Sequence, residues 1–235
     1  MSQPDVDSLV VESVRFAAGA YLLEGELAYA AENESLCGGV VVAGSHPLLG
    51  GNMHNNVVRG LVDGLAERGW ATLRFNYRGV GRSEGPTVDV ARHVAEFWQT
   101  SHVPGEMDLW QDVRGAVQYL RSIVGSTRPL VLIGYSFGCA LLPTVCREES
   151  SSAIVLIAPP LSKHNYNDFT TVKSPLLAIV SENDFTLEPQ RLHEWFAPLP
   201  EPKQMVQASL DNHFFRGHEP WLVETVSSFL EEHVR

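Results

Sequence analysis

Ser136 is the residue of this chain whose surroundings most clearly indicate chemistry. It stands in the centre of G-Y-S-F-G, residues 134–138, directly after the apolar run P-L-V-L-I. Glycines two positions away on each side allow a sharp turn from a strand into a helix, and such a turn exposes the serine hydroxyl. The N-terminus of the following helix favours developing negative charge. The pattern predicts a nucleophile, against the alternative of an ordinary helix-capping serine.

A serine hydroxyl needs a histidine base, and the histidine needs a carboxylate that orients it. Asp184 comes just after the apolar run P-L-L-A-I-V, and His213 comes in the loop after the next apolar run. The order Ser136, Asp184, His213 is one that a large class of enzymes uses. Three residues of the same types compete for these roles: Glu182, Asp168 and His218.

The pattern of the chain predicts the elements that would position these residues. Two imperfectly alternating segments, 9–17 and 21–30, predict an antiparallel hairpin. Short apolar runs then alternate with amphipathic segments, which is typical of βαβ units and a mostly parallel sheet with helices on both faces. Strands are expected at 37–44, 70–77, 129–134, 153–158, 175–180 and 203–208. Helices are expected at 52–68, 108–124, from 137, at 189–196 and at 220–234.

Length and charge limit the class of protein. The 235 residues, 44% of them hydrophobic, suffice for a single α/β domain over residues 1–235. A net charge of −11 repels phosphate backbones and anionic lipid, so we expect neither nucleic acid nor a membrane as partner. The pattern leaves the oligomeric state open.

The cysteines and the N-terminal residues bear on location. The three cysteines contain no C-x-x-C pair, so we expect neither a disulfide scaffold nor a cysteine zinc site, and we expect all three to be buried. The first residues, M-S-Q-P-D-V-D-S, lack the basic start and apolar core of a signal peptide. We therefore expect a cytoplasmic protein.

Two further blocks, beside the predicted triad, resemble a known family. They are H-P-L-L-G-G-N-M-H-N-N, residues 46–56, and L-R-F-N-Y-R-G-V-G-R-S-E-G, residues 73–85. With them the chain resembles, over nearly its whole length, the α/β-hydrolase superfamily, and within it small bacterial serine hydrolases related to dienelactone hydrolase and Xaa-Pro peptidase-like proteins. The resemblance implies an α/β-hydrolase fold, a serine triad, no metal and no cofactor.

The resemblance also implies an oxyanion hole made of two backbone amides. One belongs to the residue after the nucleophile, Phe137. The other lies after the third strand, where Pro47 has no amide hydrogen, so Leu48 is the candidate. We expect His46 to brace this loop rather than to act as a base. Arg78 and Arg82 are expected to hold their loop beside the site, with carboxylate binding as the alternative.

Two segments bear on substrate access. Residues 159–175 leave no room for a large cap domain between two strands. Residues 86–109 contain an amphipathic helix, and a lid or pocket wall is the functional interpretation, with a packed surface helix as the alternative. The candidate substrate-binding residues are Tyr135, Phe97, Trp98 and Trp110.

These residues together predict a serine hydrolase of the carboxylesterase type, which acylates Ser136 with a small-molecule acyl substrate. The triad does not separate esters, thioesters and amides. The alternatives are an acyltransferase, thioesterase or lyase that reuses the triad, and a non-catalytic binding protein on the same fold.

Overall fold

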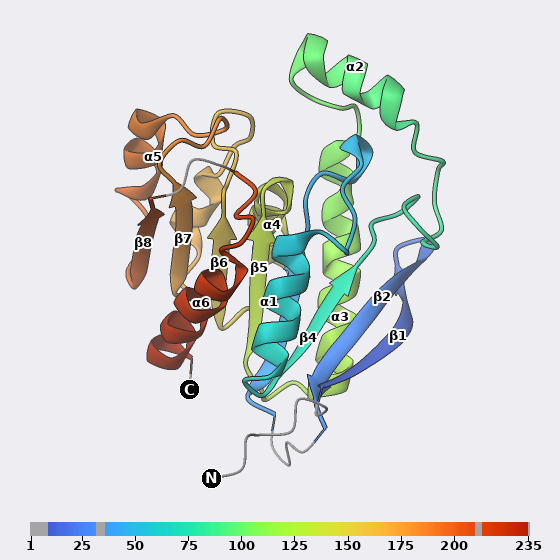
Figure 1. Cartoon of the computed structure of the whole chain (residues 1–235), viewed down its shortest axis with the longest axis vertical. Coiled ribbons are helices and arrows are strands. Elements are labelled where there is room, and N and C mark those ends of the chain that lie inside the picture. The colour runs from blue at the N-terminus through green and yellow to red at the C-terminus, as the bar shows by residue number, and fades with distance from the viewer. Residues whose placement is uncertain (1–8, 32–35, 210–212, 235) are drawn as a thin grey trace.

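The computed structural model describes residues 9–31, 36–209 and 213–234. An eight-stranded sheet with the order β1-β2-β4-β3-β5-β6-β7-β8 runs through the molecule (Figure 1). The strands are β1 (Leu9–Ala18), β2 (Tyr21–Ala30), β3 (Gly38–Ala43), β4 (Trp70–Phe75), β5 (Leu130–Tyr135), β6 (Ala153–Ile157), β7 (Leu176–Ser181) and β8 (Lys203–Ala208). The helices are α1 (Asn56–Ala66), α2 (Val90–Thr100), α3 (Trp110–Val124), α4 (Phe137–Glu148), α5 (Pro189–Phe196) and α6 (Glu219–His233). Three short 3-10 helices are η1 (Pro47–Leu49), η2 (Glu106–Leu109) and η3 (Asn167–Thr171).

The pairing of the strands confirms the predicted fold class. β1 and β2 form an antiparallel hairpin, and β2 is also antiparallel to β4. From β4 to β8 all neighbours are parallel. The strands β3 to β7 are buried along their whole length, which is why they consist almost entirely of apolar residues.

Helices cover both faces of the sheet. The apolar faces of α1 and α6 pack on one side, where Leu61 and Val226 are fully buried. The apolar faces of α3 and α4 pack on the other side, around Val117 and Leu141. Figure 1 shows α1 and α6 in front of the sheet and α3 and α4 behind it. Because the strands from β4 to β8 are parallel, their carboxyl ends all lie at one edge of the sheet, where ligands bind in such folds.

Two helices begin later than the sequence pattern predicts. α1 begins at Asn56 rather than near 52, because the Asn55 side chain accepts the Val57 amide and caps the helix. α3 begins at Trp110, since residues 106–109 form the separate turn η2.

The segment from 86 to 109 rises above the carboxyl ends of the strands (Figure 1). Its helix α2 begins after Asp89, whose side chain accepts the Arg92 amide. All eleven residues of α2 are described and none is buried. The helix packs against η1 rather than against the sheet.

The cysteines only partly match the expectation from the sequence. Cys139 is buried, Cys146 is partly buried and Cys37 is exposed, so the expectation that all three cysteines are buried holds fully for Cys139 alone and is wrong for Cys37. Residues 1–8, on which the expected location rests, lie outside the described part of the chain. Within that described part, every helix is too short or too polar to cross a bilayer.

Candidate active site

Ser136 lies in a strained turn between β5 and α4. Its backbone has φ 54° and ψ −120°, a conformation that non-glycine residues rarely adopt. A Cβ at Gly138 would stand 2.1 Å from the Ala43 carbonyl oxygen, and one at Gly134 would stand 2.7 Å from the Cys139 Cα atom. Both glycines are therefore needed for the close approach of α4 to β3 and β5. The turn presents the Ser136 side chain at the carboxyl end of β5.

Ser136, His213 and Asp184 form a continuous chain of hydrogen bonds. His213 Nε2 lies 2.8 Å from Ser136 Oγ, and His213 Nδ1 lies 2.8 Å from Asp184 Oδ2. A carboxylate only accepts hydrogen bonds, so Nδ1 carries the hydrogen and Nε2 is left to accept from the serine hydroxyl. His213 and Asp184 are 4% and 6% exposed, so their mutual contact is buried, whereas the contact of His213 with Ser136 is partly buried.

Asp184 is held by its own loop as well as by His213. The Thr186 amide and hydroxyl both donate to Asp184 Oδ1, at 2.8 and 2.7 Å. Burial alone raises the pKa of Asp184, but the hydrogen bonds from His213 and Thr186 outweigh it and lower the pKa below its ordinary value. The carboxylate is therefore ionised at neutral pH.

His213 is also fixed from behind, by contacts that sequence reasoning did not anticipate. The hydroxyl of Tyr135 donates to the His213 carbonyl at 3.3 Å. The ring of Phe185 lies 5.0 Å from the imidazole, centroid to centroid. The sequence signal for the Phe185 contact is that Phe185 directly follows Asp184 and so lies near the same histidine.

The competing residues lie in other contacts. Asp168 pairs with Arg147 at 2.9 Å, and exposed Glu182 accepts a hydrogen bond from Ser209. His218 precedes α6 as its N-cap residue. The geometry thus joins Ser136 to His213 and Asp184.

Ser136 opens into a cavity of about 560 Å³. Of the predicted substrate-binding residues, Tyr135, Phe97 and Trp98 line it. The other lining residues are Ser45, His46, Leu49, Gly50, Gly51, Asn55, Phe137, Pro160, Lys163, His164, Phe185, Thr186, His213 and Phe214. Most of the wall is therefore apolar or aromatic, and part of it comes from α2.

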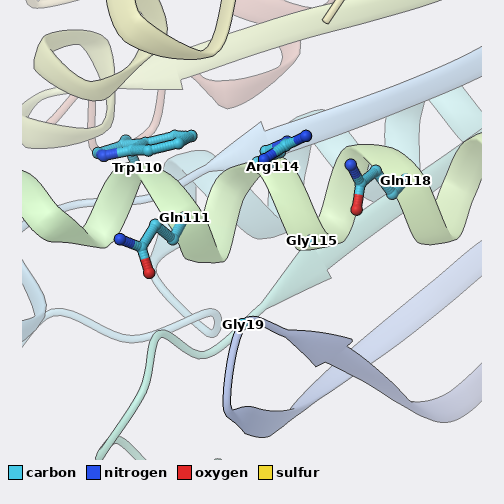
Figure 2. A pocket seen from close by; sticks show the side chains of 6 residues that line it. All are labelled: Gly19, Trp110, Gln111, Arg114, Gly115 and Gln118. Atoms are coloured by element: carbon cyan, nitrogen blue, oxygen red, sulfur yellow. The ribbon is translucent and has the colours of Figure 1, made fainter. Parts of the chain in front are cut away.

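Trp110 is not part of this wall. It begins α3 and lines a separate groove of about 240 Å³, which also includes Gly19 at the β1–β2 turn and Gly115 (Figure 2). The sequence suggests Trp110 as part of the cavity wall, because it directly follows the 86–109 segment. In the structure η2 ends at Leu109, and Trp110 is the first residue of α3, with its side chain packed against the core on that face of the sheet.

The loop after β3 contacts the start of α4. The His46 ring stacks on Phe137 with centroids 4.1 Å apart. Phe137 is the first residue of α4, so its amide is one of those with no acceptor inside the helix. The amides of Leu49, Gly50 and Gly51 donate to the carbonyls of His46 or Pro47. Leu48 lies within this turn, but it is Leu49 that lines the cavity.

His46 also belongs to a buried cluster around Glu106. Glu106 is 3% exposed, and its Oε2 lies 2.9 Å from His46 Nε2 and 2.8 Å from the Val103 amide. Its Oε1 lies 3.1 Å from His102 Nδ1 and 3.9 Å from His164 Nδ1. His102 and Glu106 are four positions apart, but His46 and His164 come from segments distant in sequence, so no local pattern indicates the whole cluster.

The charges in this cluster are set by burial and by hydrogen bonds. Burial raises the pKa of Glu106, but hydrogen bonds from His46, Val103 and His102 lower it to below its ordinary value. Burial lowers the pKa of the His164 imidazole to about 4. Glu106 is therefore ionised at neutral pH, and His164 is neutral.

Arg78 and Arg82 hold their loop, as expected. The Arg78 side chain donates to Asp112 at 2.7 Å, and the Arg82 side chain donates to Glu24 at 2.7 Å. Neither lines the cavity of Ser136.

Solved structures of similar fold define the class of this protein. A serine hydrolase without lid from Xanthomonas campestris has a TM-score of 0.77 and 23% identity, covering 95% of each chain. A serine hydrolase homologue from Coxiella burnetii has a TM-score of 0.73 and 26% identity, covering 93% of this chain and 97% of that one. The Pyrococcus furiosus esterase Pf2001 has a TM-score of 0.74 and 15% identity, covering 97% and 92%. The fold is that of the α/β-hydrolase superfamily, without a large cap.

Sequence comparison narrows this class. The family described as "Serine aminopeptidase, S33" matches residues 41–189, more than half of the chain, and the protein belongs to this family of hydrolases. An uncharacterized protein of Rickettsia prowazekii (strain Madrid E) is 26% identical over 141 residues, which are 59% of this chain. The aligned residues make up 52% of the Rickettsia protein, so the match spans about half the length of that relative.

Proposed function

We propose that the protein is a serine hydrolase that cleaves a carboxylic ester, or a related acyl bond, of a small molecule through an acyl-enzyme on Ser136. One observation carries the proposal: Ser136, His213 and Asp184 are joined by two contacts of 2.8 Å beside a cavity with apolar walls. The net charge of −11 argues against nucleic acid as the substrate.

Acylation begins with attack of Ser136 Oγ on the carbonyl carbon of the substrate. His213 Nε2 takes the serine proton as the new C–O bond forms, and the Asp184 carboxylate stabilises the resulting imidazolium. The amide of Phe137 donates to the oxyanion, with that of Leu48 as the second donor. Collapse of the tetrahedral intermediate breaks the bond to the leaving group, which receives the proton from His213.

Deacylation repeats these steps with water. His213 Nε2 removes a proton from water, the hydroxide oxygen bonds to the acyl carbon, and the same amides hold the second oxyanion. Collapse breaks the ester bond to Ser136 Oγ, which regains its proton from His213. One water is consumed, and one acid and one leaving group are released.

The cavity supports an apolar acyl or leaving group. Five phenylalanine and tryptophan residues line it in addition to Tyr135, namely Phe97, Trp98, Phe137, Phe185 and Phe214. Trp98 is 82% and Phe185 76% exposed, so water can reach the rim. Access of water favours hydrolysis over acyl transfer, which requires a dry acyl-enzyme.

The charge of the cavity favours an ester over an aminopeptidase substrate. Among the described residues that line it there is no Asp or Glu, and Lys163 carries the only permanent charge. A free α-ammonium group would therefore meet a cation where it needs an anion. We accordingly prefer carboxylesterase chemistry to the peptidase activity in the family's name.

A panel of substrates tests the proposal. Wild type and Ser136→Ala would be assayed on p-nitrophenyl esters of rising acyl length, with an acyl-CoA and an amino-acid p-nitroanilide alongside. We expect ester turnover with an optimum at intermediate length, lost in Ser136→Ala and kept in Ser122→Ala, an exposed serine of α3. Wild-type turnover in Ser136→Ala would refute the mechanism. A marked preference for the anilide would refute the ester class alone.

A further inference from the structure

Three side chains outside the triad lie close together near the C-terminal end of α2. His102 follows the helix, Glu106 lies in η2, and His164 lies in the loop after β6. One nitrogen of each imidazole and one oxygen of the carboxylate all lie within 4.8 Å of one another. We call these three residues the His–Glu cluster.

The two carboxylate oxygens of Glu106 have different partners, and one of them lies toward the cluster. Its Oε2 accepts the Val103 amide at 2.8 Å and lies 2.9 Å from His46 Nε2. Among the residues that the structure describes, its Oε1 lies near the two imidazoles of the cluster, at 3.1 Å from His102 Nδ1 and 3.9 Å from His164 Nδ1. Support of a carboxylate by neighbouring donors is typical of metal sites, where such contacts orient the ligand.

Glu106 has no lysine or arginine partner in the described part of the chain. Its ion pairs there are with the imidazoles of His46, His102 and His164. The nearby Lys163 instead donates to the Ser101 hydroxyl, at 3.1 Å. A carboxylate that is 3% exposed with no Lys or Arg partner is electrostatically suited to a bound cation.

We propose that His102, Glu106 and His164 bind one divalent transition-metal ion of the zinc type, with water as a fourth ligand. Two imidazole nitrogens and a carboxylate oxygen suit zinc, whereas Mg²⁺ and Ca²⁺ prefer oxygen ligands alone. Ligands about 2.0–2.2 Å from a tetrahedral zinc ion stand somewhat over 3 Å apart. The ligand atoms lie within 4.8 Å of one another, so the longest separation needs to close by about 1.5 Å at most, and the His102 side chain, 56% exposed, has room to move.

The ion would serve structure rather than the acyl chemistry. Its ligands come from the segment that contains α2 and from the loop after β6, so it would fasten one end of α2 to the body of the enzyme. His164 also lines the cavity of Ser136, so the fastening would fix part of the cavity wall. The positive charge of Lys163 opposes the ion, and Lys163→Gln should therefore tighten binding.

Calorimetry on the full chain, freed of metal with EDTA and dialysed, tests the site. We expect Zn²⁺ to bind with a stoichiometry of one and micromolar affinity, and Co²⁺ to give the visible absorption of a tetrahedral site. His102→Ala and Glu106→Gln should each weaken Zn²⁺ binding by about 30-fold or more. His193→Ala, an exposed histidine of α5, is the matched control and should bind as wild type.

Two results would overturn the proposal. One is the absence of stoichiometric Zn²⁺ binding by folded wild type. The other is unchanged affinity in His102→Ala, whose exposed side chain can be removed without loss of the fold even if Glu106→Gln fails to fold. The readout is independent of hydrolase activity, so the proposed function and this site can fail separately.

Discussion

The two sides of the cavity differ in how firmly the fold holds them. His213 and Asp184 are almost completely buried and stand at the carboxyl ends of strands, of which β7 is itself buried along its whole length. On the opposite side, α2 has no buried residue, and Trp98 is 82% exposed. The sheet therefore fixes the triad, while the α2 side depends on contacts with η1 and with the loop after β6.

The difference leads us to expect chemistry and selectivity on different sides of the cavity. Ser136, His213 and Asp184 are held by the core, so under the proposed mechanism we expect changes there to lower kcat or to abolish folding. Residues of α2 line the cavity without supporting the core, so we expect changes there to alter which substrate binds. The following predictions test that division.

The largest expected effect follows from removing the base or its carboxylate. His213→Ala and Asp184→Asn should each lower kcat by roughly 10⁴-fold, because the serine loses its proton acceptor or the imidazole loses its orientation. Steady-state kinetics on the preferred ester measures this. His218→Ala is the control and should stay within a few-fold of wild type, and a loss there equal to that of His213→Ala would contradict the assignment.

The turn around Ser136 should tolerate no added methyl group. Gly138→Ala would place Cβ 2.1 Å from the Ala43 carbonyl oxygen, which cannot move away cheaply. We expect a loss of about 3 kcal/mol in the free energy of unfolding, measured by urea denaturation. Gly44→Ala, where Cβ meets only Val58 at 3.4 Å, should cost far less. Equal stabilities would show that the turn is not closely packed.

The α2 side should respond in KM and not in stability. Trp98→Ala should raise KM for long-chain esters by about 10-fold through lost apolar contact, and leave turnover of p-nitrophenyl acetate and the Tm unchanged. Trp221→Ala, a partly exposed tryptophan of α6, should change no kinetic constant. If Phe97→Ala and Trp98→Ala both left KM and kcat unchanged for every ester, α2 would be only a surface helix.

The smallest expected effect is a pH dependence of stability from His164. Its pKa is about 4 in the folded chain and near 6.5 when unfolded, so between these values the unfolded chain binds the extra proton. Stability should therefore fall as pH drops from about 6.5 to about 4. In metal-free buffer, His164→Gln should reduce this fall in Tm by a few degrees, with His193→Gln as control. If Tm depended on pH in the same way in His164→Gln and in wild type, the proposed effect of burial on the His164 pKa would be contradicted.

Much of this arrangement follows from local sequence. The β-branched runs predicted the parallel strands, and G-Y-S-F-G marked the turn that holds Ser136. The carboxyl ends of parallel strands share one edge of a sheet. Because Asp184 and His213 each follow an apolar run that predicts such a strand, their positions in the chain suffice to place them at the same edge as Ser136.

The parts that sequence reasoning missed depend on contacts between distant segments. The sequence wrongly suggests Trp110 as a residue of the cavity, because the boundary between η2 and α3, which decides the direction of its side chain, has no sharp signal in the sequence. His102, Glu106 and His164 meet only when the segment after α2 folds against the loop after β6. His102 and Glu106 are four positions apart, but no spacing rule joins them to His164, about sixty positions further along the chain.

The most direct test of the central claim is the intact mass of the protein after reaction with a fluorophosphonate, followed by peptide mapping. We predict one adduct per chain, on the peptide that contains Ser136, and none in Ser136→Ala. A folded wild type that takes up no label, or a Ser136→Ala variant that is labelled as fully as wild type, would contradict it.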